Sequence, residues 1–223
     1  MHSIVIGSPF ALRHASWRLV AIAALASAGM VLGGVLQGWR VWGIGLAAVV
    51  PWLPVFVAEA AWIYRWHAWL ALFYVLVVTQ VGHLFEHVAQ MTQIHLLHHS
   101  GAQAQGIFGA LDIEWVHFIW NTWVLVAVIL LLRRFPENRW LWATALLAGW
   151  HEMEHLVVFS LYLSTGRAGT PGLLGQGGLI AGGLPVPRAD LHFLYNAIET
   201  IPLVISFVWQ FTKITRSLQS GGT

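Results

Sequence analysis

The sequence contains no cysteine and little charge. Only 9% of its 223 residues are Asp, Glu, Lys or Arg, and 58% are hydrophobic, whereas about 25% of the residues in an average soluble domain are charged. Without cysteine the chain has no disulfides, thiolate metal sites or iron–sulfur clusters, so any metal must be held by nitrogen and oxygen. The low charge excludes a soluble, disordered or nucleic-acid-binding chain. It indicates an integral membrane protein that is embedded in, and contacts, the lipid bilayer.

Long apolar runs fill most of the chain instead. A membrane-spanning helix needs about 20 apolar residues, and six stretches provide them: 17–36, 41–62, 67–92, 114–132, 140–163 and 191–212. The 14 Trp residues suit the two interfacial belts of a bilayer. Because the first apolar stretch continues to residue 36, we expect it to remain as a helix and not to be cleaved as a signal peptide. We therefore predict an all-α integral membrane bundle of six transmembrane helices, a single domain over residues 1–223.

The positions of the 11 Lys and Arg residues predict the orientation of this bundle. Such residues are retained preferentially on the cytoplasmic side of a membrane. In a six-helix topology one side collects Arg13, Arg18, Arg65, Arg133, Arg134, Arg139, Lys213 and Arg216, and the other collects only Arg40, Arg167 and Arg188. Both termini are therefore expected in the cytoplasm of a bacterial cell. Segments 93–113 and 165–188 are expected on the extracytoplasmic side of the inner membrane.

Polar residues interrupt the last four apolar stretches at helical spacing. From His83 to Gln90 they recur at i, i+3, i+4 and i+7, which places them on one helical face. Comparable stripes run from Glu114 to Asn121, from His151 to His155 and from His192 to Glu199. In the predicted topology all four stripes lie in the outer half of the bilayer. An ionisable group near the bilayer centre costs about 2.5–3.5 kcal/mol, so we expect these side chains to face inward around a shared cation.

The residue types in these stripes predict a metal centre. Carboxylate oxygen and imidazole nitrogen suit iron, zinc, copper and manganese. Histidines one turn apart, such as His83 with His87 and His151 with His155, can reach one ion from the same helix. The sequence therefore predicts two metal ions within the part 67–212, with iron as the first choice and zinc or copper as alternatives. The candidate metal ligands are His83, Glu86, His87, Glu114, His117, His151, Glu152, Glu154, His155, His192 and Glu199.

Three histidine-rich motifs carry a family resemblance: HLFEH at 83–87, HLLHH at 95–99 and HEMEH at 151–155. Together they resemble the HxxxH, HxxHH and HxxxH boxes of the membrane-bound di-iron desaturases and hydroxylases, over about 82–196. The resemblance implies two irons that activate oxygen to attack a C–H bond of a hydrophobic or lipid-like substrate. His95, His98 and His99 are then additional candidate ligands; otherwise they are interfacial histidines wetted at the headgroups. Such an oxidoreductase needs electrons from a quinol or another donor.

Two other functions fit parts of the same pattern. Residues 151–155 also match HExxH, the zinc hydrolase motif in which both histidines bind zinc and the glutamate activates water. Glu152 would then be the general base, with His192 or Glu199 as a third ligand. Glu152 and Glu154 are the candidate catalytic residues overall. The remaining alternative is a non-enzymatic protein that handles copper or zinc. For the oxidative enzyme, we expect the Gly-rich segment 165–188 to cover the site and admit substrate.

Overall fold

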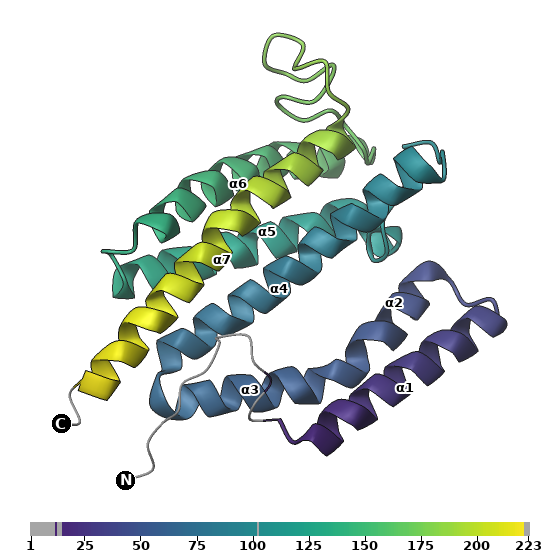
Figure 1. Cartoon of the computed structure of the whole chain (residues 1–223). Coiled ribbons are helices and arrows are strands. Elements are labelled where there is room, and N and C mark those ends of the chain that lie inside the picture. The colour runs from purple at the N-terminus through teal and green to yellow at the C-terminus, as the bar shows by residue number, and fades with distance from the viewer. Residues whose placement is uncertain (1–11, 13–14, 102, 221–223) are drawn as a thin grey trace.

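The protein is a bundle of helices whose long axes run roughly side by side (Figure 1). The computed structural model describes residues 12, 15–101 and 103–220, apart from the side chains of 110, 112 and 218–220. Arg13, which contributes to the charge count above, lies outside the described residues. The described part contains no β-strand, only one isolated bridge between Gly178 and Gly182. The prediction of an all-α protein is confirmed.

The helices follow the predicted apolar stretches closely. Their bounds are α1 Trp17–Leu36, α2 Val41–Val49, α3 Leu53–Trp66, α4 Ala68–Met91, α5 Gly109–Arg134, α6 Arg139–Thr165 and α7 Arg188–Ser220. A 3-10 turn, η1 (Val50–Trp52), joins α2 to α3, and a π-helical turn, η2 (Thr92–Leu96), extends α4. The expected continuous helix 41–62 is thus interrupted. Pro51 and Pro54 stand at this break, where each lacks the N–H that an uninterrupted helix would use.

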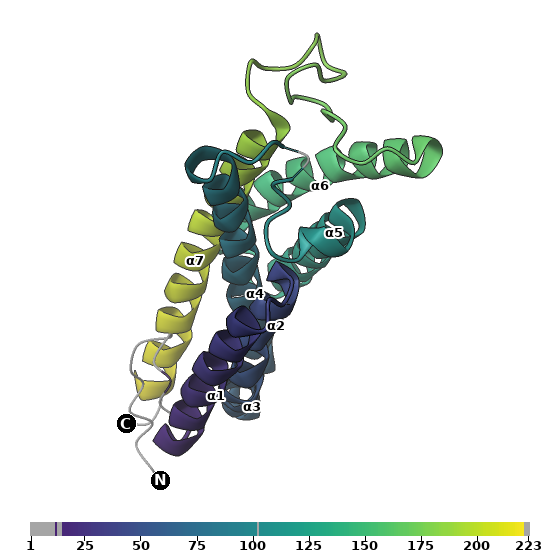
Figure 2. The ribbon, with the colours of Figure 1, turned by 90° about the vertical axis from the view of Figure 1, so that its right-hand side faces the viewer.

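Four of the helices form the bundle that carries the polar stripes. Helix α5 packs against α4 and α6, and α7 packs against α4 and α6, which closes a ring of four. Helices α1 and α2 form a hairpin beside this ring, and α3 packs on α4. Figure 1 shows α1, α2 and α3 together on the lower right of the four-helix group, and in the view turned by 90° α1 and α2 overlap α4 (Figure 2). The start of α1 and the end of α7 lie at one end of the molecule, and the α6–α7 loop lies at the other (Figure 1).

Five helical segments among the described residues are long and apolar enough to cross a membrane. They are Trp17–Leu36, Val41–Trp66, Ala68–Leu96, Ile113–Arg134 and Arg188–Ser217. Helix α6 has sufficient length, at 27 residues, but the histidines and glutamates of its HEMEH sequence reduce its mean hydropathy. It packs between α5 and α7. The helices are consistent with an integral membrane protein.

The buried face of α4 changes in character along its length. Its first half buries apolar side chains from Leu70 to Val77, and its second half buries Gln80, His83, Glu86, His87 and Gln90. The apolar half belongs to a core cluster that includes Phe73, Leu131 and Phe207. The bundle therefore has an apolar end and a polar end. The polar end is the one near the α6–α7 loop (Figure 1).

Candidate metal centre

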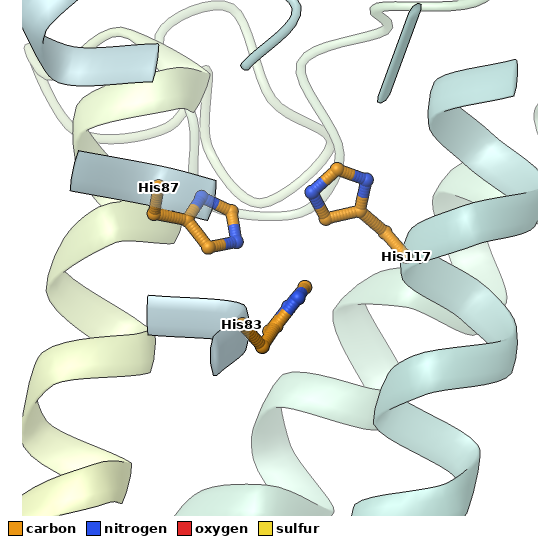
Figure 3. A group of neighbouring side chains, drawn as sticks. All are labelled: His83, His87 and His117. Carbon is orange, nitrogen blue, oxygen red and sulfur yellow. The ribbon is translucent and has the colours of Figure 1, made fainter. Parts of the chain in front are cut away.

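Three histidines from two helices meet at the polar end of the bundle. His83 and His87 come from α4 and His117 from α5, and all three are buried. Each offers a ring nitrogen, and these nitrogens lie within 4.8 Å of one another. Figure 3 shows the three rings grouped around a common space between α4 and α5. We call His83, His87 and His117 the first triad; its geometry suits one metal ion.

A second triad has the same composition on the other two helices. His151 and His155 come from α6, one turn apart, and His192 comes from the first turns of α7. Their ligand atoms also lie within 4.8 Å of one another, and all three residues are buried. Each triad thus combines an HxxxH pair on one helix with a single histidine on a packed neighbour. This arrangement follows from the sequence, because i and i+4 side chains share a helical face.

The two triads lie next to each other. The ring of His117 in the first triad stacks on the ring of His155 in the second, with centroids 5.9 Å apart and an angle of 10° between the planes. His155 in turn lies 4.8 Å from His192, again between ring centroids. The four helices therefore enclose one six-histidine cluster and not two separate sites. It can accommodate two ions as neighbours.

Hydrogen bonds fix the protonation of three of these rings. His117 Nδ1–H donates to the Ile113 carbonyl at 2.6 Å, and His192 Nδ1–H donates to the Arg188 carbonyl at 3.0 Å. A carbonyl oxygen only accepts, so Nδ1 carries the proton and Nε2 keeps its lone pair. His151 Nδ1 lies 3.0 Å from Glu199 Oε2, which is the carboxylate partner that metal-ligating histidines often have. For His117 and His192, Nε2 is thereby left available as a ligand.

Several of the remaining ring nitrogens have no hydrogen-bond partner. They include Nε2 of His83, both ring nitrogens of His87 and Nε2 of His192. His151 Nε2 and His155 Nε2 face each other at 3.2 Å, and the first of these already has its proton on Nδ1. A buried polar atom without a partner costs about 1–3 kcal/mol. Metal ions in the two triads would satisfy these nitrogens, so the residues fit such ions.

Three of the candidate carboxylates hold loops and do not belong to a triad. Glu86 Oε1 accepts the backbone N–H groups of Ile107, Phe108 and Gly109 at 2.7, 2.8 and 3.0 Å. Glu154 Oε1 accepts the N–H of Leu173 at 2.8 Å. These bonds tie the segment after η2 and the α6–α7 loop to the helices that carry the histidines.

Glu114 holds both a loop and the start of α7. Its two carboxylate oxygens form a bidentate ion pair with Arg188, with both N–O distances 2.8 Å, and Oε1 also accepts the N–H of Gly169. Arg188 in turn supplies the carbonyl that accepts from His192. Glu114 therefore influences the second triad through the position of this arginine.

The remaining candidate carboxylates, Glu199 and Glu152, bond to other side chains. Glu199 contacts His151, as described, and Glu152 Oε1 accepts the Thr122 hydroxyl at 2.7 Å. Glu152 Oε2 and Glu199 Oε1 are buried without a hydrogen-bond partner. Within the described residues, the groups that could share one ion contain histidine alone. The structure thus brings together six of the predicted side chains as two three-histidine groups, with Glu199 beside one of them.

The histidines of the HLLHH motif lie apart from both triads. His95, His98 and His99 are exposed at the end of η2 and just beyond it. His95 Nε2 contacts Asp190 Oδ1 at 2.6 Å, which links η2 to the first turn of α7. His98 adopts a left-handed backbone conformation, with φ of 56°.

Sequence reasoning missed several residues that contact the cluster. Trp120 stacks on His83 with ring centroids 5.1 Å apart. The ring centroids of Tyr195 and His151 are 5.4 Å apart. Trp120 and Tyr195 each stand three residues after a triad histidine, so the helical spacing could have revealed them. The partnership of Arg188 with Glu114 has no such signal, because the two residues are distant in the chain.

Gly106 allows the segment after η2 to approach Glu86. Its φ is +66° and a Cβ atom there would contact the Glu86 carboxylate. Gly106→Ala is expected to lower the free energy of unfolding by about 2–4 kcal/mol, because the left-handed conformation and the crowding each have a cost. Thermal unfolding in detergent measures this change. Gly101→Ala is the matched control, because a Cβ atom at Gly101 meets open space; equal losses in the two variants would contradict the argument.

Two of the three histidine-rich motifs, at 83–87 and 151–155, supply four of the six triad histidines. The other two, His117 and His192, stand outside any such motif. The HLLHH motif supplies none. No protein-family model, curated protein or solved structure matches this chain, so the resemblance to the histidine-box enzymes stays a prediction.

Proposed function

We propose that this protein is a membrane-embedded, metal-dependent oxidoreductase that holds two metal ions side by side, one in each triad. The observation that carries the proposal is the pair of adjacent, buried three-histidine groups, which share the contact between His117 and His155. Ionisable side chains within membrane-spanning helices have an unfavourable free energy of insertion, and they usually mark a functional site. Six of them converge here from four helices.

The donor atoms favour copper over iron. Each triad offers three imidazoles, which suit copper, zinc, iron and nickel, whereas helical di-iron sites rely on bridging and terminal carboxylates. Here the groups that could share one ion contain histidine alone among the described residues. Glu114 pairs with Arg188, and one oxygen each of Glu86 and Glu154 accepts backbone N–H groups, while their other oxygens have no hydrogen-bond partner. This departs from the expectation of iron that the sequence raises. When bound, a copper pair would supply one-electron redox chemistry toward oxygen.

The chain's own residues would orient and isolate this centre. Glu199 holds the His151 ring through Nδ1, and the carbonyls of Ile113 and Arg188 do the same for His117 and His192. Hydrogen bonds of this kind fix ring orientation and raise the basicity of the ligand. All six rings are buried.

The surroundings of the centre support an enzyme over a metal carrier. The core cluster with Phe73, Leu131 and Phe207 fills the bundle beyond the triads, whereas a carrier would need a polar path through it.

An oxidoreductase also needs an electron donor, which we propose to be a quinol or another redox partner in the bilayer. From the charge bias we propose that the protein lies in a cytoplasmic membrane, with both termini inside and the triads toward the extracytoplasmic face.

A zinc hydrolase is the second candidate. His151, His155 and His192 form the three-ligand set of such an enzyme, and Glu152 of the HExxH motif is buried with one partner-free oxygen. This function would leave the first triad without a role, although it lies directly against the second. The dinuclear proposal accounts for both.

Metal analysis decides between these functions. The protein purified without chelator and measured by mass spectrometry is expected to contain two copper ions per chain. One zinc ion per chain would favour the hydrolase, and no bound metal after incubation with copper, iron or zinc salts would refute both. Glu152→Gln is the matched variant, because it removes the general base of a hydrolase and leaves the six imidazoles unchanged. Under the dinuclear proposal it keeps both ions and its oxidase activity, whereas a hydrolase would keep its zinc and lose its activity.

A further inference from the structure

A cavity of about 580 Å³ reaches the six-histidine cluster from the loop end of the bundle. His87 and His117 of the first triad and His192 of the second line it. Because these three residues are buried, they form its inner end. The cavity therefore gives access to both triads at once, and its volume is within the range of sites for small molecules.

The outer residues of the cavity place its mouth. Gly101, Ala168, Gly169 and Pro187 line it, and all four are exposed. They belong to the segment after η2 and to the α6–α7 loop, which lie at the same end of the molecule (Figure 1). Helix α6, which ends before this loop, contributes no lining residue. The mouth thus lies between loops, and not between the outer sides of two helices.

The charged residues that line the cavity are each paired with a residue of opposite charge or with a histidine. Arg188 and Asp190 are its charged lining residues, and each has a partner: Arg188 pairs with Glu114, and Asp190 with His95. In the metal-free protein, a charged ligand would lose its hydration in this cavity without gaining an unpaired opposite charge from the chain, which is costly. An uncharged ligand would not have this cost. The side chains of Ile94 and Ile113 provide apolar walls, and the Gln90 amide adds a polar group.

We propose that this cavity is the substrate entrance, and that it admits a small, uncharged organic molecule from the aqueous side. The inference rests on the proposed function, because it supplies a route to the paired metal sites. It differs from the lipid-like substrate implied by the histidine motifs. A bilayer lipid would have to enter past the loop end, leaving its chains outside the cavity. Segment 166–187 acts as the outer wall and is held there by Glu114 and Glu154.

The natural absence of cysteine provides a direct test. Single cysteines are introduced at Ala189, in the wall, and at Ala168, at the mouth, in the full chain in proteoliposomes. The probes are three water-soluble methanethiosulfonates: the neutral methyl reagent, the anionic sulfonatoethyl reagent and the cationic trimethylammonioethyl reagent. Relative to Ala168→Cys, the Ala189→Cys variant is expected to favour the neutral reagent over both charged ones by about tenfold or more, as desolvation of a charge implies.

Several outcomes would overturn the inference. Equal rates for the charged and neutral reagents at Ala189→Cys would refute an uncharged ligand. Reaction only with a maleimide that carries an acyl chain would show entry from the lipid. Ile94→Cys, on the opposite wall, repeats the measurement if Ala189→Cys does not fold. Leu146→Cys, on an exposed part of α6 outside the cavity, is expected to react with the acyl maleimide alone.

A second readout separates this inference from the proposed function. In copper-loaded protein, a thiol adduct at Ala189→Cys is expected to slow removal of the metal by a water-soluble chelator, because the adduct blocks the route to the triads. Unchanged removal would refute the entrance. If the protein binds no metal, the proposed function fails, whereas the thiol labelling still decides whether the cavity admits uncharged molecules from water.

Discussion

His155→Ala is expected to reduce the bound metal from two ions per chain to one and to abolish oxidase activity. His155 is the histidine of the second triad that stacks on the first, and its Nε2 lies 3.2 Å from that of His151. Without it, the second triad has two imidazoles. Its affinity for the ion should fall by more than about 100-fold, since loss of an outer hydrogen bond alone weakens metal sites roughly 10–100-fold. Mass spectrometry of the purified variant measures the metal content.

The control for this variant is another histidine that lies outside the triads. His98→Ala changes the same residue type at an exposed position and is expected to retain both ions. Thermal unfolding of the metal-free proteins separates ligand loss from general damage, because His155 is also buried and its removal leaves a cavity. Retention of two ions by His155→Ala, or equal metal loss in His98→Ala, would argue against the two-triad centre.

The fold was largely predictable because a bilayer imposes a strict length and polarity on a helix. The apolar stretches 17–36 and 191–212 both fall within helices, and the periodicity of the polar residues placed His83 with His87 and His151 with His155. The break between α2 and α3 also had a visible signal in Pro51 and Pro54. It was missed because hydropathy alone does not register a missing N–H.

The roles of the carboxylates were much harder to predict. Helical spacing puts Glu86 on the same face as His83, three residues earlier, but it does not say whether a nearby loop will present N–H groups to the glutamate. Gly106, with φ of +66°, turns the segment after η2 so that three such groups meet Glu86. Loop geometry of this kind has no periodic pattern. The sequence therefore identified the polar residues at this end of the bundle but could not divide them between metal ligation and loop anchoring.

The anchoring of α7 to α5 also explains why charged residues stand near the starts of these two helices. Glu114 and Arg188 form a bidentate pair whose side chains are 1% and 15% exposed. Arg188 is the first residue of α7, and its carbonyl accepts the Nδ1–H of His192 four residues later. The pair joins the start of α7 to α5 and sets the ring that completes the second triad. An ion pair outside the triads thus contributes to their geometry.

Glu114→Gln is accordingly expected to lower the free energy of unfolding by about 3–5 kcal/mol, because it leaves the Arg188 guanidinium buried without its counter-charge. Chemical unfolding in detergent, followed by tryptophan fluorescence, measures the loss. The double variant Glu114→Met with Arg188→Met removes both charges and is expected to recover most of the stability. Glu137→Gln is the matched control, since its ion pair with Lys213 is 45% and 50% exposed and such pairs contribute about 0–1 kcal/mol. If Glu114→Gln cost no more than Glu137→Gln, the pair would not anchor α7, and the orientation of His192 would have to depend on the helix alone.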